Sequence, residues 1–105
     1  MTAARDTERQ LLARCVAVAL GEVADATDQR EANVFRVAAS VIRSEFPQES
    51  VRLTQVATRY FAIYPEHALH SSEVVRRAWI IGLPRLRDRL SRELNRAKSS
   101  LPFGG

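Results

Sequence analysis

Apolar residues recur at three- and four-residue steps along most of the chain, which is the spacing of amphipathic helices. The first such stripe predicts a helix over residues 3–26. Gly21 falls inside it, and we interpret this glycine as a place where a neighbour packs closely, since it costs about 1 kcal/mol against alanine in a helix. Cys15 lies within the stripe, so we expect a buried structural thiol. The stripe consists of Leu12, Cys15, Val16, Ala19, Leu20 and Val23.

A second helix is predicted to start after Asp28 and to end near Glu45. Asp28 and Glu31 have the spacing of a capping box, in which each side chain satisfies a backbone amide at the helix start. Pro47 disfavours helical geometry at the residue before it and so ends the helix. Because only two or three residues separate the first two helices, we expect an antiparallel hairpin over residues 1–46.

Residues 50–64 carry a complete helical stripe, and Pro65 ends it. The same segment begins with Ser50-Val51-Arg52-Leu53-Thr54, whose weak alternation leaves a short strand at 50–54 as an alternative. Residues 64–70 are interpreted as a turn. The stripe consists of Leu53, Val56, Ala57, Tyr60, Phe61 and Tyr64.

Two further helices follow the turn. Ser71 or Ser72 is expected to cap the fourth, with Trp79 anchoring a core stripe and Gly82-Leu83 ending it. Pro84 suits the first position of a fifth helix that runs to Ser99. The pattern therefore predicts an all-α protein of four to five helices, forming a single domain over residues 1–105. Its hairpin is followed by a second helical half over 50–99. The fourth stripe consists of Val74, Val75, Ala78, Trp79 and Ile81.

The positive charge lies in the second half of the chain. The net charge is +4, of which residues 1–50 contribute −2 and residues 51–105 contribute +6. The longest apolar run is about six residues, too short to span a membrane, and the N-terminus has no signal-peptide pattern. These features predict a cytoplasmic protein with no membrane contact and an anionic partner.

No constellation of residues indicates catalysis. The sequence has no glycine-rich phosphate loop and no nucleophile with a base nearby, so we expect no enzyme activity and no cofactor. Its single cysteine excludes an intramolecular disulfide. Glu66, His67 and His70 lie in the predicted turn, and without a further ligand in sight we expect exposed loop histidines there.

The fifth helix is sharply two-sided. Leucines form one face, and four arginines lie within about 60° of one another on the opposite face. Guanidinium groups bind phosphate oxygens bidentately, so this row suits a nucleic-acid backbone. A solvated basic face is the alternative. The arginine row consists of Arg85, Arg89, Arg92 and Arg96.

Residues 71–83 carry a Ser-Ser-Glu start, a Val-Val-Arg-Arg-Ala core and a closing Gly-Leu. The chain from Ser50 to Leu86 thereby resembles the ribbon-helix-helix family of DNA-binding proteins. This resemblance implies a homodimer whose paired strands enter the major groove, with Ser50, Arg52 and Thr54 at base edges. It also implies that Ser71, Ser72 and Glu73 lie over a phosphate at a helix start.

A helix-turn-helix is the other DNA-binding arrangement that the pattern allows. Residues 53–64 would form its first helix, 65–70 the turn and 72–82 the recognition helix. Its groove contacts would be Ser71, Ser72, Arg76 and Arg77.

Two classes of function stay open. In the first, the chain is a small DNA-binding protein, regulatory or accessory in transcription, that acts as a homodimer on double-stranded DNA. In the second, it is a helical protein–protein interaction module, such as an adaptor, chaperone or inhibitor, as the acidic first half and the aromatic cluster at residues 60–64 indicate. The predicted nucleic-acid-binding residues are Arg52, Thr54, Ser71, Ser72, Arg76, Arg77, Arg85, Arg89, Arg92 and Arg96.

Overall fold

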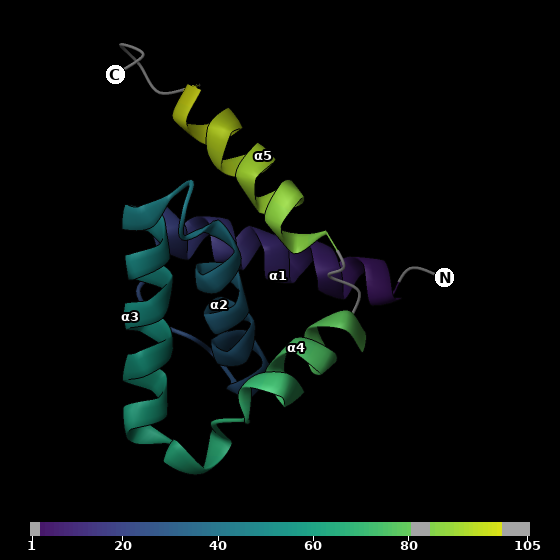
Figure 1. The fold of residues 1–105 in the computed structure, drawn as a ribbon, viewed down its shortest axis with the longest axis vertical. Coiled ribbons are helices and arrows are strands. Elements are labelled where there is room, and N and C mark those ends of the chain that lie inside the picture. The colour runs from purple at the N-terminus through teal and green to yellow at the C-terminus, as the bar shows by residue number, and fades with distance from the viewer. Residues whose placement is uncertain (1–2, 81–84, 100–105) are drawn as a thin grey trace.

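The computed structural model describes residues 3–80 and 85–99, with side chains over 7–77 and 85–99, and all regular structure in this part is helical (Figure 1). The predicted all-α class is therefore confirmed. The elements in chain order are α1 (Ala3–Ala19), α2 (Gln29–Ile42), α3 (Pro47–Ile63), the 3-10 helix η1 (Pro65–His67), α4 (Ser71–Ile80) and α5 (Leu86–Ser99).

Helices α2 and α3 form an antiparallel pair joined by residues 43–46 (Figure 1). Asp28 caps α2 as predicted, because its Oδ1 accepts a hydrogen bond from the amide of Glu31 at 2.8 Å. The Glu31 carboxylate accepts in return from the amide of Thr27 at 3.0 Å. Pro47 is the first residue of α3, where its missing amide proton costs nothing.

The alternative of a short strand at 50–54 is wrong, since these residues lie inside α3. The helical period prevails over the weak alternation because Leu53, Val56 and Ala57 bury one face of the helix against the core. Ser50 is buried as well, and its hydroxyl donates to the carbonyl oxygen of Ala39 at 2.7 Å, which ties α3 to α2.

Helix α1 ends at Ala19 rather than at residue 26. Gly21 adopts φ +81°, the left-handed conformation that glycine favours directly after a helix. The amide of Gly21 bonds the carbonyl oxygen of Val18 at 3.0 Å, and the amide of Glu22 bonds that of Ala17 at 2.8 Å. This pair of bonds is a Schellman motif, so Gly21 terminates the helix instead of marking an interior position.

The early end of α1 lengthens the connection to α2 to residues 20–28. With this longer connection, α1 crosses the α2–α3 pair instead of lying antiparallel beside α2 (Figure 1). The predicted hairpin over residues 1–46 is therefore wrong, and α3 is the antiparallel partner of α2.

One hydrophobic core joins α1, α2, α3 and α5. Cys15 is fully buried in it, as predicted, and burial raises the pKa of its thiol to about 12. Helix α5 closes the core with three leucines. The largest fully buried side chains are Phe35, Ile42, Leu53, Leu90, Leu94, Val18 and Cys15.

Helix α4 packs against α2 (Figure 1). Val74 is buried as predicted, but Val75 is 49% exposed, so the core position predicted for Val75 is wrong. The predicted core roles of Ala78, Trp79 and Ile81, and the helix end at Gly82-Leu83, fall on side chains or residues outside the described part. No described helix is long and apolar enough to cross a membrane.

Candidate nucleic-acid interface

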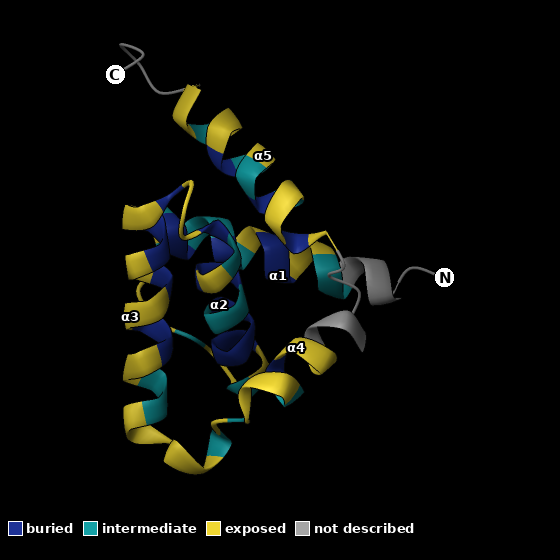
Figure 2. Ribbon diagram, viewed as in Figure 1, coloured by how far each residue is buried: buried dark blue, intermediate teal, exposed yellow. Residues whose placement is uncertain are grey.

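The leucine face of α5 is anchored in the core. Leu86, Leu90 and Leu94 are 4%, 0% and 0% exposed where the helix packs on α1 and α2. The side of α5 that faces away from the core is exposed (Figure 2). The amphipathic division predicted for this helix is therefore confirmed, and the arginine row is held on a fixed support.

Within the described part of the chain, Arg89 is the member of the row that pairs with a charge on another helix. Its Nη1 forms an ion pair with Oε1 of Glu8 in α1, and both side chains are largely covered. The pair joins α5 to α1, so Arg89 acts inside the fold rather than as a free cation. Sequence reasoning missed Glu8 because no local pattern shows which helix packs beside α5.

The other three arginines of the row point to solvent. Arg96 pairs with Glu93 of its own helix at 3.2 Å, and the arginine stays 68% exposed. Arg85 and Arg92 are exposed, and within the described part of the chain no ion pair or side-chain hydrogen bond engages either. Two unpaired guanidinium groups and one weakly paired group therefore remain in the row.

The flanks of α5 add further charge. Arg87 is exposed on one flank, and Lys98 bonds Oε2 of the buried Glu49 in α3 at 2.8 Å. Burial alone would raise the pKa of Glu49, but the ion pair with Lys98 lowers it below its ordinary value. Residues 85–99 hold six basic and two acidic side chains, a net of +4, as large as the net charge of the whole chain.

Arg52 is placed differently from the DNA contact that the resemblance implies. Its Nη1 donates to the carbonyl oxygen of Ala19 at 2.9 Å, so the guanidinium caps the C-terminus of α1. Thr54 is exposed on α3, beside α2 rather than beside α5. Neither residue lies in the α5 arginine row.

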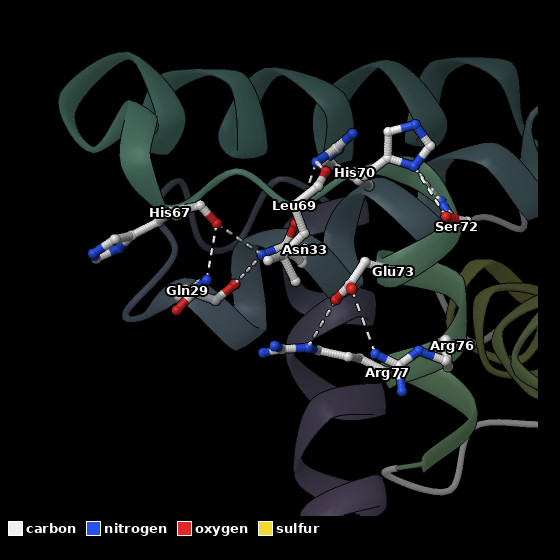
Figure 3. A network of polar contacts seen from close by, with 10 residues as sticks. Gln29, Asn33, His67, Leu69, His70, Ser72, Glu73, Arg76 and Arg77 are labelled. Atoms are coloured by element: carbon white, nitrogen blue, oxygen red, sulfur yellow. Dashed lines mark hydrogen bonds and ion pairs between the residues drawn. The ribbon is translucent and has the colours of Figure 1, made fainter.

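Arg76 and Arg77 of α4 share one acidic partner. Figure 3 shows Glu73 between them, at 3.5 Å from Arg76 and 3.7 Å from Arg77. Both arginines are more than half exposed. Their pairs with Glu73 lie within one helix in solvent, so they stabilise weakly and leave both cations accessible.

The start of α4 is capped by a histidine rather than by a serine. Nδ1 of His70 accepts from the amide of Ser72 at 3.3 Å and lies 3.0 Å from its hydroxyl (Figure 3). Ser71 is the first helical residue, and both serines are exposed. His70 therefore takes the capping role predicted for Ser71 or Ser72.

The segment between α3 and α4 is pinned to α2. The side-chain amide of Gln29 donates to the carbonyl oxygen of His67 at 3.0 Å (Figure 3), and Arg36 donates to that of Leu69 at 3.1 Å. These bonds hold α4 against α2, while α3 diverges from the turn (Figure 1). In the described part of the predicted helix-turn-helix, α3, a connection that contains η1, and α4 follow one another, but α2 rather than α3 supports α4.

The histidines of the turn are engaged rather than free. His67 Nδ1 is hydrogen-bonded to the Tyr60 hydroxyl at 2.7 Å, and its ring stacks on Tyr64 with centroids 5.2 Å apart. Among the described side chains, no group of three or more His, Cys, Asp and Glu residues is placed to hold a metal ion.

Comparison with models of protein families, with curated proteins and with solved structures found no match for this chain. The resemblance to the ribbon-helix-helix family therefore stays a prediction from residues 50–86, and the function has to be argued from the surface itself.

Proposed function

We propose that the protein binds nucleic acid through the exposed arginines of α5, which contact the phosphate backbone. The observation that supports this most directly is that Arg85, directly before α5, and Arg92 in α5 are exposed and unpaired within the described structure, while the other face of α5 is fixed in the core. A rigid row of cations loses little conformational freedom when it meets a row of phosphates.

The spacing of the row favours an extended polyanion over a single small anion. Arg92 and Arg96 lie about 40° apart around α5, and Arg85 directly precedes the first residue of the helix. Along its axis they are about 10 Å and 6 Å apart, at 1.5 Å per residue. No single phosphate reaches all three, whereas a nucleic-acid strand presents phosphates repeatedly over that length.

The proposed contacts are to the backbone and carry no sequence information. Arg52, the one arginine that the resemblance placed at a base edge, is engaged at the end of α1. In this proposal the chain is a small regulatory or accessory factor on double-stranded DNA, and a homodimer would present two arginine rows to one duplex.

The test is binding to a random DNA duplex, measured by fluorescence anisotropy across a salt series. The double variant Arg85→Ala/Arg92→Ala should bind more weakly, and the slope of log Kobs against log salt should flatten by about 1.8, at 0.9 for each lost phosphate contact.

The matched control is Arg30→Ala/Arg43→Ala, which removes the same charge from two exposed arginines at α2. It should leave the slope close to that of the unchanged protein. The proposal is overturned if both double variants behave alike, or if the unchanged protein shows no salt-dependent binding.

A further inference from the structure

The surface between α2 and α3 carries two adjoining hollows, which together are called the α2–α3 groove; no residue of α5 lines either of them. One part has a volume of about 420 Å³ and is lined mainly by apolar atoms of Ala57, Phe61 and Ala62. The adjoining part, of about 170 Å³, is polar and is lined by Ser40, Arg43 and Ser50, among others. The two parts share the lining residues Arg36 and Thr54, so they adjoin one another along the helix pair.

The charge of the groove has one sign. Its described lining includes two arginines, Arg36 and Arg43, and no acidic residue. Arg36 is held in place, because its Nη1 bonds the carbonyl oxygen of Leu69 and its guanidinium lies 5.4 Å from the centroid of the Phe61 ring. Arg43 is exposed, and no hydrogen bond or ion pair within the described part engages its side chain.

An exposed apolar residue extends the wall of the groove. Val51 is 53% exposed. It lies on the same side of α3 as Thr58 and Ala62, at seven- and eleven-residue separations that return to one helical face. On α2, Arg36 is half-buried, whereas Ser40 and Arg43 are exposed. The groove therefore combines an apolar floor, an apolar edge and two positive charges, of which the Arg36 guanidinium is held in place.

We propose that this groove docks an acidic amphipathic helix from a partner protein. A groove between two antiparallel helices fits a third helix, whose apolar side chains enter it. Arg36 and Arg43 are seven residues apart, about 10 Å along α2. Two carboxylates seven residues apart on the incoming helix lie on one face at the same spacing, so both meet a guanidinium group.

This proposal does not depend on nucleic-acid binding, because no member of the α5 arginine row lines the groove. It makes the protein bifunctional, with polyanion contact at α5 and a protein contact at the α2–α3 groove.

The probe is a synthetic helical peptide of about 15 residues, or 22 Å of helix, with two glutamates seven residues apart and leucines between them. Binding is followed by fluorescence anisotropy and by backbone amide shifts in NMR. The largest shifts should fall on residues 36–43 and 50–62. A second peptide with the same glutamates, but with serines in place of leucines, should bind more weakly. It buries no apolar side chains against the floor of the groove.

Two variants address the groove from its two helices. Arg43→Glu reverses a charge on α2, and Thr58→Glu adds a negative charge on the α3 wall. Each should weaken probe binding about five- to ten-fold, the cost of placing like charges together at a partly covered contact. The matched control is Arg30→Glu, which makes the same reversal about 120° around α2 from Arg36 and should bind as the unchanged protein does.

Arg85→Ala/Arg92→Ala should also bind the probe normally, so failure of the groove proposal and failure of the DNA proposal are separate results. The groove proposal is overturned if the probe shifts amides elsewhere, or if Arg43→Glu and Thr58→Glu bind it as tightly as Arg30→Glu does. Absence of probe binding to the unchanged protein overturns it as well.

Discussion

Arg52 in α3 donates a hydrogen bond from Nη1 to the carbonyl oxygen of Ala19, the last residue of α1, at 2.9 Å. The last carbonyl groups of a helix have no partner within it, and a cation at this end also interacts favourably with the helix dipole. The side chain lies against Gly21, whose missing Cβ would be 3.9 Å from Arg52 Nε. The bond therefore joins two helices at the point where the chain turns.

Replacing Arg52 by alanine should lower the free energy of unfolding by about 1 kcal/mol, because one charge-assisted hydrogen bond and the interaction with the dipole are lost. Urea denaturation measures this. Affinity for duplex DNA should stay within about two-fold of the unchanged protein, since this arginine is not in the α5 row. A stable variant that binds DNA much more weakly would instead make Arg52 a DNA contact.

Gly21→Ala should destabilise the protein by about 1 kcal/mol, because φ +81° is unfavourable for a residue with a Cβ. The space around the position is open enough that the cost comes from the backbone conformation alone. Gly21→Asn is the matched variant, since asparagine tolerates this conformation better. Thermal denaturation should rank glycine above asparagine and asparagine above alanine, and the same midpoint for all three would contradict the assignment.

Glu31 links stability to pH. Burial of its carboxylate would raise its pKa, but hydrogen bonds from Arg14 at 2.9 Å and from the amide of Thr27 outweigh this and lower the pKa below its ordinary value. A group whose pKa is lower in the folded chain stabilises it fully above the unfolded pKa, about 4.3 for glutamate. That contribution is lost as the pH falls through the folded value.

Glu31→Gln should therefore cost about 2 kcal/mol at neutral pH and show a flatter loss of stability between pH 5 and pH 3. Urea denaturation at a series of pH values measures both effects. Glu22→Gln, at an exposed carboxylate, is the control and should keep the pH profile of the unchanged protein. Parallel profiles for the two variants would show that the Arg14 contact contributes nothing.

Glu8→Gln should release Arg89 from its ion pair with α1. Stability should fall by at most about 1 kcal/mol, as is usual for a pair near the surface. If the α5 row binds phosphate, the freed guanidinium adds a contact, and the salt slope should steepen by up to 0.9. A weaker affinity with an unchanged slope would mean that the pair, rather than a free cation, supports binding.

The sequence predicted helix starts, helix ends and buried faces correctly where neighbouring residues in the chain determine them. The Asp28 cap, Pro47 and the leucine stripe of α5 each act within a few residues, so periodicity and capping rules were enough to predict them. Gly21 was misinterpreted because a glycine between apolar residues fits both a helix interior and a helix end. The hydrogen bonds of the turn decide between these, and the apolar pattern does not contain them.

The sequence predicted which helix face carries the arginines of the candidate interface, but not which of these arginines form ion pairs. The 3.6-residue period places the four arginines of the row on one face of the predicted fifth helix. Which of them stays free depends on Glu8, far away in sequence, and on Glu93 in the same helix. The role of Arg52 was hidden for the same reason, since its acceptor is a backbone carbonyl group of another helix. The groove on α2 and α3 arises only when those two helices pair.

The burial of Cys15 has a practical consequence. Its thiolate is strongly disfavoured inside the core, and the thiolate is the form that attacks maleimides and disulfide reagents. The folded protein should therefore react only slowly with thiol reagents. A cysteine introduced at Arg92 or at Thr58 would carry a dye or spin label alone, with the wild-type cysteine left in place. One folded chain thus offers separate reporters for α5 and for the α2–α3 groove.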